Sequence, residues 1–329
     1  MLTDIPLWVW VLFVLGIDVG HVWSTIFRTY LDKQEFRQHR TLLLVAPAVS
    51  FLMAMGLAWY RIEWFWRGLA YLAVFHFIKQ QYGFLALYKT KAKDWAMRKF
   101  WNDKFIIYWA TLYPVLYWHL APDIQFSWFV TNDFVSLSSY WGAYANWLPY
   151  VLLVANILYW LVLLAWLREE VQLSTRLQWG KLLWVGTTAI NWYGGIVYFN
   201  SDLAFTVTNI VAHGLPYFAL ILYYNQQKKG IIHRKASSIW KGALVVIPIV
   251  FLLAFLEEYW WDRLIYGDRA AFFGQIIPYS ESLLQQPLPI AIAIGILTVP
   301  QMTHYIIDGF IWKTNDKNPY LKPIFSDHE

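Results

Sequence analysis

Long apolar runs recur along the whole chain and restrict the folds that are open to it. Each contains roughly 20 mainly uncharged residues, the length that an α-helix needs to cross the hydrocarbon core of a bilayer. Charged residues form only 14% of the chain, whereas they form about a quarter of an ordinary soluble domain. The pattern therefore predicts an all-α, polytopic membrane protein with one transmembrane domain over residues 1–329.

We predict nine transmembrane helices, and the basic residues indicate their orientation. With nine helices, the loops and the tail on one side hold 21 of the 26 Lys and Arg residues. Basic loops face the cytoplasm, so the N-terminus is predicted outside and the C-terminus inside. A bacterial cytoplasmic membrane is the expected location. The predicted helices are 6–27, 41–60, 64–88, 105–121, 147–167, 181–200, 203–224, 239–259 and 287–312.

The chain has no cysteine and carries a net charge of +5. The lack of cysteine excludes disulfides, thiolate nucleophiles and cysteine-bound haem or iron–sulfur clusters. In a soluble protein the positive charge would suggest nucleic acid, but here the topology accounts for it. We therefore expect no nucleic-acid partner. The expected partners are membrane lipids and a lipid-soluble small molecule, and the oligomeric state is left open.

Besides His119, four histidines lie inside predicted helices, namely His21, His76, His213 and His304. An ionisable side chain within a bilayer is costly and usually marks a functional site. The four helices are predicted to run in the same direction, and the histidines lie between mid-membrane and the cytoplasmic side. One metal site is therefore the leading interpretation. A structural or proton-relay hydrogen-bond network is the alternative.

Each histidine has a polar neighbour about one helical turn away, on the same helix face. A metal-bound imidazole usually donates its second N–H to such a neighbour. Asp18 and Asp308 are candidate metal ligands or supports, and with Tyr217 they are the candidate catalytic residues. The donor set favours non-haem iron, mononuclear or dinuclear, with zinc or manganese as alternatives. The amides predicted to support the histidines are Gln80, Asn209 and Gln301.

Other polar and helix-breaking residues lie near these positions. Pro216 and Pro300 each lie about one turn from a candidate histidine and predict a broken helix there. His119 is interpreted as a satisfied or interfacial residue, and His39 as a solvent-exposed one. Two glutamates at 257 and 258 end a predicted helix and are interpreted as markers of the membrane interface.

Two short motifs resemble a known family. The segment GIDVGH at 16–21 and the segment FHF at 75–77 are similar to the first two histidine elements of the bacterial membrane β-carotene dioxygenases of the Brp/Blh type. That resemblance implies a non-haem iron held within the membrane by four histidines. The later histidines depart from the family pattern, which places two of them one turn apart on one helix. Here His213 is followed by Tyr217, and the fourth histidine lies on the last helix.

The leading functional hypothesis is an iron-dependent oxygenase or desaturase. Its substrate would be lipid-soluble: an isoprenoid, a carotenoid, a quinone or an acyl chain. With zinc instead, hydrolysis with an aspartate as general base would be favoured. The second hypothesis is a proton-coupled transporter or proton-relay subunit that uses the same His/Asp pairs, although no inverted repeat is visible. The third is a haem b protein with two axial histidines, which four histidines that lie singly on four helices fit less well.

Overall fold

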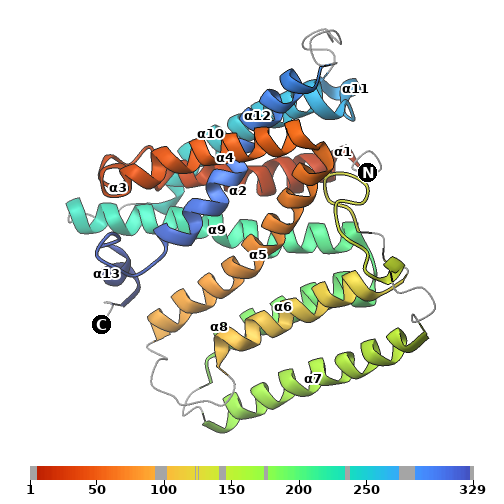
Figure 1. The fold of residues 1–329 in the computed structure, drawn as a ribbon. Coiled ribbons are helices and arrows are strands. Elements are labelled where there is room, and N and C mark those ends of the chain that lie inside the picture. The colour runs from red at the N-terminus through yellow and green to blue at the C-terminus, as the bar shows by residue number, and fades with distance from the viewer. Residues whose placement is uncertain are drawn as a thin grey trace. The chain divides into compact units, whose positions relative to one another are not determined.

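The computed structural model describes residues 6–92, 102–122, 124, 126–140, 146–173, 177–233, 238–273 and 286–326. Within these residues all regular secondary structure is helical (Figure 1), which confirms the predicted all-α class. The chain divides into two compact units, and each is described by itself. Unit 1 comprises Met1–Leu72 and Gly214–Ile324, and unit 2 comprises Ala73–His213 and Phe325–Glu329.

Six helices among the described residues are long and apolar enough to cross a membrane, and they indicate a membrane protein. They match six of the predicted spans, while the total of nine and the orientation stay predictions. The six are Leu7–Phe27, Arg40–Tyr60 (α4), Leu148–Leu173 (α7), Asp202–Ile232, Ile239–Tyr266 and Pro287–Ile311 (α12).

The other three predicted spans also fold as helices. They are α5 (Ile62–Ala92), α6 (Asp103–Leu120) and α8 (Trp179–Trp192), which continues into the π-helical segment η6 (Tyr193–Tyr198). The α5 helix carries Arg67 and Lys79 within its length, α6 begins with Asp103 and Lys104, and α8 contains Lys181 and Asn191. These polar residues make the three helices less apolar than a typical span.

The first span changes its helical geometry along its length. It consists of α1 (Leu7–Val9), the π-helical η2 (Trp10–Val19), α2 (Gly20–Ser24) and the 3₁₀ turn η3 (Thr25–Phe27). Wide π-helical turns are rare and often occur at functional sites. The candidate residue Asp18 lies at the end of η2, and His21 lies in α2, directly after it.

In unit 1, α2 packs against α10 (Ile239–Trp261) and α12, and α12 runs along α4. Gly20 makes the first of these contacts possible. A Cβ atom there would lie 3.1 Å from Phe218 Cζ and 3.3 Å from Val250 Cγ1. Gly214 allows α9 (Asp202–His233) to pack closely against η2, because a Cβ atom at this position would lie 2.7 Å from Ile17 Cγ2. Two glycines thus let α9 and α10 approach the segment that carries Ile17 and His21.

The prolines do not break their helices. The α9 helix is continuous through Pro216, and α12 is continuous through Pro300. The predicted breaks beside His213 and His304 were therefore wrong. A proline removes one backbone hydrogen bond, but the remaining bonds of a long helix and its packed neighbours can hold the helix together.

In unit 2, α6, α7, α8 and η6 enclose an aromatic core that includes Tyr113, Tyr159 and Trp166. Among the shorter elements described are α3 (Lys33–Gln38), η4 (Ser138–Tyr140), η7 (Asp262–Tyr266), α11 (Ala270–Phe273) and α13 (Leu321–Ser326).

Four helix ends in unit 2 meet at a buried ion network. The ammonium group of Lys181, at the start of α8, lies 2.7 Å from Glu170 Oε2 on α7 and 3.7 Å from Asp103 Oδ2 on α6. Lys89, on α5, also donates to Asp103. Lys181, Glu170 and Asp103 are buried. The described part of the network thus pairs two positive with two negative charges, and three of the four residues are buried.

Asp32 fixes the start of α3 in unit 1. Its Oδ1 accepts hydrogen bonds from the backbone N–H groups of Gln34 and Glu35 at 3.0 and 3.1 Å, and Lys228 Nζ lies 2.8 Å from its Oδ2. Burial acts to raise the pKa of Asp32, but the Lys228 hydrogen bond and charge and the two N–H groups outweigh it. The pKa of this carboxyl therefore lies below its ordinary value.

We expect Asp32→Asn to destabilise the protein at neutral pH, and the cost to disappear in acid. The folded pKa is depressed, so the charged form stabilises the fold above the unfolded pKa of about 3.9. That contribution is lost as the pH falls through the folded pKa. Asparagine still caps a helix well, so the change isolates the charge. Unfolding midpoints of both proteins across the acidic range test this, and a pH-independent difference would contradict it.

Candidate metal centre

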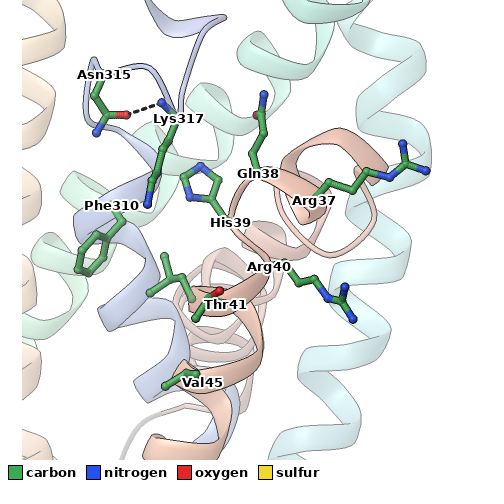
Figure 2. Close-up of a pocket in the computed structure, with 10 residues that line it drawn as sticks. Arg37, Gln38, His39, Arg40, Thr41, Val45, Phe310, Asn315 and Lys317 are labelled. Carbon is green, nitrogen blue, oxygen red and sulfur yellow. Dashed lines mark hydrogen bonds between the residues drawn. The ribbon is translucent and has the colours of Figure 1, made fainter.

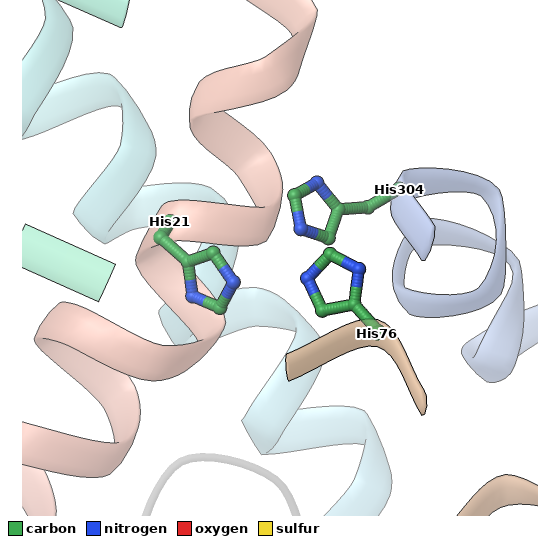
Figure 3. Close-up of side chains that lie close together, drawn as sticks. All are labelled: His21, His76 and His304. Carbon is green, nitrogen blue, oxygen red and sulfur yellow. The ribbon is translucent and has the colours of Figure 1, made fainter. Parts of the chain in front are cut away.

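His21 and His304 lie side by side in unit 1 (Figure 3). Their side chains are 1% and 2% exposed, and their ring centroids are 5.0 Å apart at an interplanar angle of 84°. Each offers a ring nitrogen within 4.8 Å of one on the other. Two nitrogens bound to one ion lie roughly 3–4 Å apart, so a small rotation of the rings would let both bind it. Figure 3 also draws His76, which belongs to unit 2.

Thr25 connects His304 with Tyr217. Its Oγ1 lies 2.8 Å from His304 Nδ1 and 3.1 Å from the Tyr217 hydroxyl oxygen, and all three side chains are buried. The hydroxyl engages Nδ1, and the geometry therefore favours Nε2 as the metal-binding atom of His304. The sequence prediction missed Thr25, although it lies four residues after His21. The one-turn spacing that drew attention to Asp18 would also have found it.

The Tyr217 ring closes the site on another side. It packs edge-on against His304 and His21, with centroid distances of 5.1 and 5.8 Å. Asp308, one turn after His304, lies near enough for its charge to act on the Tyr217 hydroxyl. The structure thus brings two candidate catalytic residues, Tyr217 and Asp308, to the same part of unit 1 as the histidine pair.

Asp18 lies beside His21, with 3.7 Å between its Oδ1 and His21 Nδ1. This distance is too long for a hydrogen bond, but it is compatible with a carboxylate that acts on the imidazole through its charge. Asp18 is half-buried, whereas His21 is fully buried. A negative charge at this position would favour a cation bound at the histidine pair.

The structure adds two glutamates, Glu257 and Glu258, to the side of the site where Asp18 lies, which is called the acidic side below. Glu257 Oε2 accepts a hydrogen bond from Trp23 Nε1 at 2.6 Å, and the charge of Asp18 acts on both Glu257 and Glu258. The sequence interpretation treated both glutamates as markers of the membrane interface only. The Trp23–Glu257 contact joins residues 234 positions apart, and no local pattern could have predicted it.

Gln301 forms a hydrogen bond that the spacing did not indicate. Its Nε2 donates to the Tyr305 hydroxyl at 2.8 Å. The charge of Asp18 also acts on this hydroxyl. Gln301 therefore positions Tyr305 on the acidic side of the site, while Thr25 is the group that bonds His304 Nδ1.

Unit 2 contains the other two candidate histidines, and both are buried. His213 Nδ1 lies 2.6 Å from the backbone carbonyl oxygen of Asn209. The prediction had assigned this contact to the side-chain amide of Asn209. A carbonyl oxygen only accepts, so Nδ1 carries the proton and Nε2 is the potential ligand atom. The Phe77 ring packs against the His213 ring, with 4.4 Å between the two ring centroids.

His76 lies on α5, with Gln80 one turn further along. Gln80 is buried, and neither polar atom of its amide has a hydrogen-bond partner among the described residues. Leaving such a group unsatisfied costs about 1–3 kcal/mol. A buried amide without a partner next to a buried histidine therefore fits a supporting group for a bound ligand better than a packing residue.

The remaining described histidines differ from the four candidates. His119 Nδ1 lies 2.6 Å from the Val115 carbonyl oxygen of its own helix, in agreement with the interpretation of a satisfied residue. The interpretation of His39 as exposed was wrong. It is buried, and its Nε2 lies 2.9 Å from Asn318 Oδ1.

Comparisons of the chain with protein-family models, with curated proteins and with solved structures found no match. The similarity to the β-carotene dioxygenases therefore stays a prediction from two motifs. The fold and the site define a class: the chain is an α-helical membrane protein with buried histidine groups that could hold a metal ion.

Proposed function

We propose that the protein is an integral-membrane non-haem metalloenzyme, an iron-dependent oxygenase or desaturase that acts on a lipid-soluble substrate. An isoprenoid, a carotenoid, a quinone or an acyl chain would suit a site within the membrane. The observation that carries the proposal is the buried pair of His21 and His304, held by Thr25 and Tyr217 on apolar helices. The proposal includes nine spans, an outside N-terminus and a bacterial cytoplasmic membrane.

The donor chemistry fits iron, zinc or manganese. Imidazole and carboxylate donors suit all three metals, and the chain has no thiolate. His21 and His304 supply two nitrogen ligands in the proposed centre. The four-histidine set predicted from the sequence is our proposal for the full ligand set. His76 and His213 are buried within unit 2.

The residues around the pair have distinct proposed roles. Bound iron would supply redox chemistry with molecular oxygen. Thr25 fixes the ring of His304, and the Asp18 carboxylate offsets positive charge beside His21. The Tyr217 hydroxyl is placed to hold a proton next to the site. The apolar surroundings keep bulk water away and favour an apolar substrate.

A second function is favoured by one specific observation. Thr25 Oγ1 links His304 and Tyr217 in a chain of buried hydrogen bonds, and such a chain can pass a proton within a membrane protein. A proton-relay subunit would need this chain and no metal. Proton flux into liposomes that contain the metal-free protein would support the relay and contradict the enzyme. A lack of flux, together with stoichiometric iron, would support the enzyme.

Thr25→Val should weaken metal binding by about 10–100-fold, the usual effect of losing a group that orients a ligand. Thr25→Ser keeps the hydroxyl and should bind as the wild type does. Affinity is measured by competition with a chelator in detergent. Thr298→Val is the matched control, because Thr298 is also buried but bonds only to the Ile294 carbonyl of its own helix. Equal affinities for the two valine variants would remove Thr25 from the site.

A further inference from the structure

A basic pocket lies in unit 1 where α3, the start of α4 and the end of α12 meet (Figure 2). Its volume is about 440 Å³, within the range of small-molecule pockets. None of the ten residues that line it is acidic, and three are cationic: Arg37, Arg40 and Lys317. Figure 2 shows the two arginines extending to one side, away from Lys317, which lies beside His39 on the other.

The acidic residues of α3 and its cap pair elsewhere, so the acidic residue that flanks the pocket-lining loop is the exposed Asp316, between Asn315 and Lys317. Asp32 and Glu35 both pair with Lys228 at 2.8 Å. The first turn of α4 also lines the pocket, and this end of a helix carries partial positive charge. His39, which precedes that turn, provides no side-chain cap, because its ring bonds to Asn318. The pocket therefore has the electrostatics of an anion site.

An apolar surface adjoins the charged part. Leu42, Val45 and Phe310 line the pocket, and the latter two are exposed. Val49 and Leu52 are exposed as well, and they follow Val45 by one and two turns on the same face of α4. The α4 helix is one of the six candidate spans, so this face is suited to contact acyl chains.

We propose that this pocket binds the phosphate headgroup of an anionic phospholipid, with an acyl chain along Val45, Val49 and Leu52. Arginine forms paired hydrogen bonds to phosphate oxygens, and lysine adds a point charge. The apolar face distinguishes a lipid from a soluble phosphate, which would use only the charged part. In the proposed topology these helix ends face the cytoplasm, where anionic lipids attract basic residues. The site is independent of the metal centre.

The test is the affinity of the full-length protein in neutral detergent for three probes: phosphatidylglycerol, phosphatidylcholine and inorganic phosphate. Binding is read from the rise of the unfolding midpoint with probe concentration. The pocket variant combines Arg37→Gln, Arg40→Gln and Lys317→Gln. The control variant removes the same charge from exposed lysines outside the pocket, through Lys33→Gln, Lys241→Gln and Lys322→Gln.

We expect phosphatidylglycerol to bind the wild type and the control alike, and to bind the pocket variant on the order of 100-fold more weakly, at roughly fivefold per charge removed. Phosphatidylcholine and inorganic phosphate should bind at least tenfold more weakly than phosphatidylglycerol. The pocket variant should keep its metal, which shows that it is folded. Equal loss in the two variants, or inorganic phosphate binding as tightly as the lipid, would overturn the proposal.

Discussion

Replacing either His21 or His304 by alanine should abolish metal binding by the purified protein. Each ring is buried, and each offers a nitrogen within 4.8 Å of the other. A centre that loses one of its imidazoles keeps too few donors to hold an ion against a chelator. We expect metal content to fall from about one equivalent to below about one tenth in both variants.

His119→Ala is the matched control for this prediction. His119 also lies in an apolar helix, but it bonds to the Val115 carbonyl of its own turn. Its removal should leave metal content unchanged. The unfolding midpoint of each variant, measured without metal, separates loss of a ligand from loss of the fold. Full metal occupancy in both His21→Ala and His304→Ala would show that the pair is not a ligand set.

Lys181→Met should cost about 3–5 kcal/mol of stability, as expected when one partner of a buried ion pair is removed. Methionine keeps most of the side-chain volume, so packing changes little. The change removes the buried cation nearest to Glu170 among the described residues, since Lys181 Nζ lies 2.7 Å from its carboxylate. Asp103 keeps the contact with Lys89. Reversible unfolding in mixed micelles measures the cost.

A second variant separates lost pairing from lost packing. Lys181→Met combined with Glu170→Leu removes both members of the pair and should recover most of the lost stability, because no unpaired charge remains buried there. Lys241→Met, at an exposed position of α10, should change stability by less than about 0.5 kcal/mol. If the double variant is no more stable than Lys181→Met, the network does not act as a compensated set.

Local patterns predicted the helices well, because the constraint on them is local. A span must be apolar over the thickness of a bilayer, and 41–60 and 287–312 agree with Arg40–Tyr60 and Pro287–Ile311 to within a residue. The π-helical geometry of Trp10–Val19 was not predictable, because apolar composition alone does not distinguish it from an α-helix.

The sequence predicted those contacts of the site that join neighbours on the same helix. Spacing placed Asp18 beside His21, as observed. The contacts between helices were missed: Thr25 to His304, and Trp23 to Glu257. These join residues more than 200 positions apart, and one sequence holds no signal for such a pair.

The burial of His39 was missed for the same reason: a contact with a residue far away in the sequence. Its neighbours are charged and polar, as in an exposed loop, and the composition favoured exposure. The residue is covered because the chain after α12 returns and places Asn318 against its ring. Burial set by a distant segment cannot be read from the composition around a residue.

The metal content of the purified wild-type protein, after expression with supplemented iron, zinc and manganese, tests the central claim most directly. We expect about one or two equivalents of bound metal, with iron in excess of the others and no Soret band, for a non-haem centre. A content below about 0.3 equivalents of every metal, in protein that unfolds cooperatively, would contradict a metal centre at these histidines.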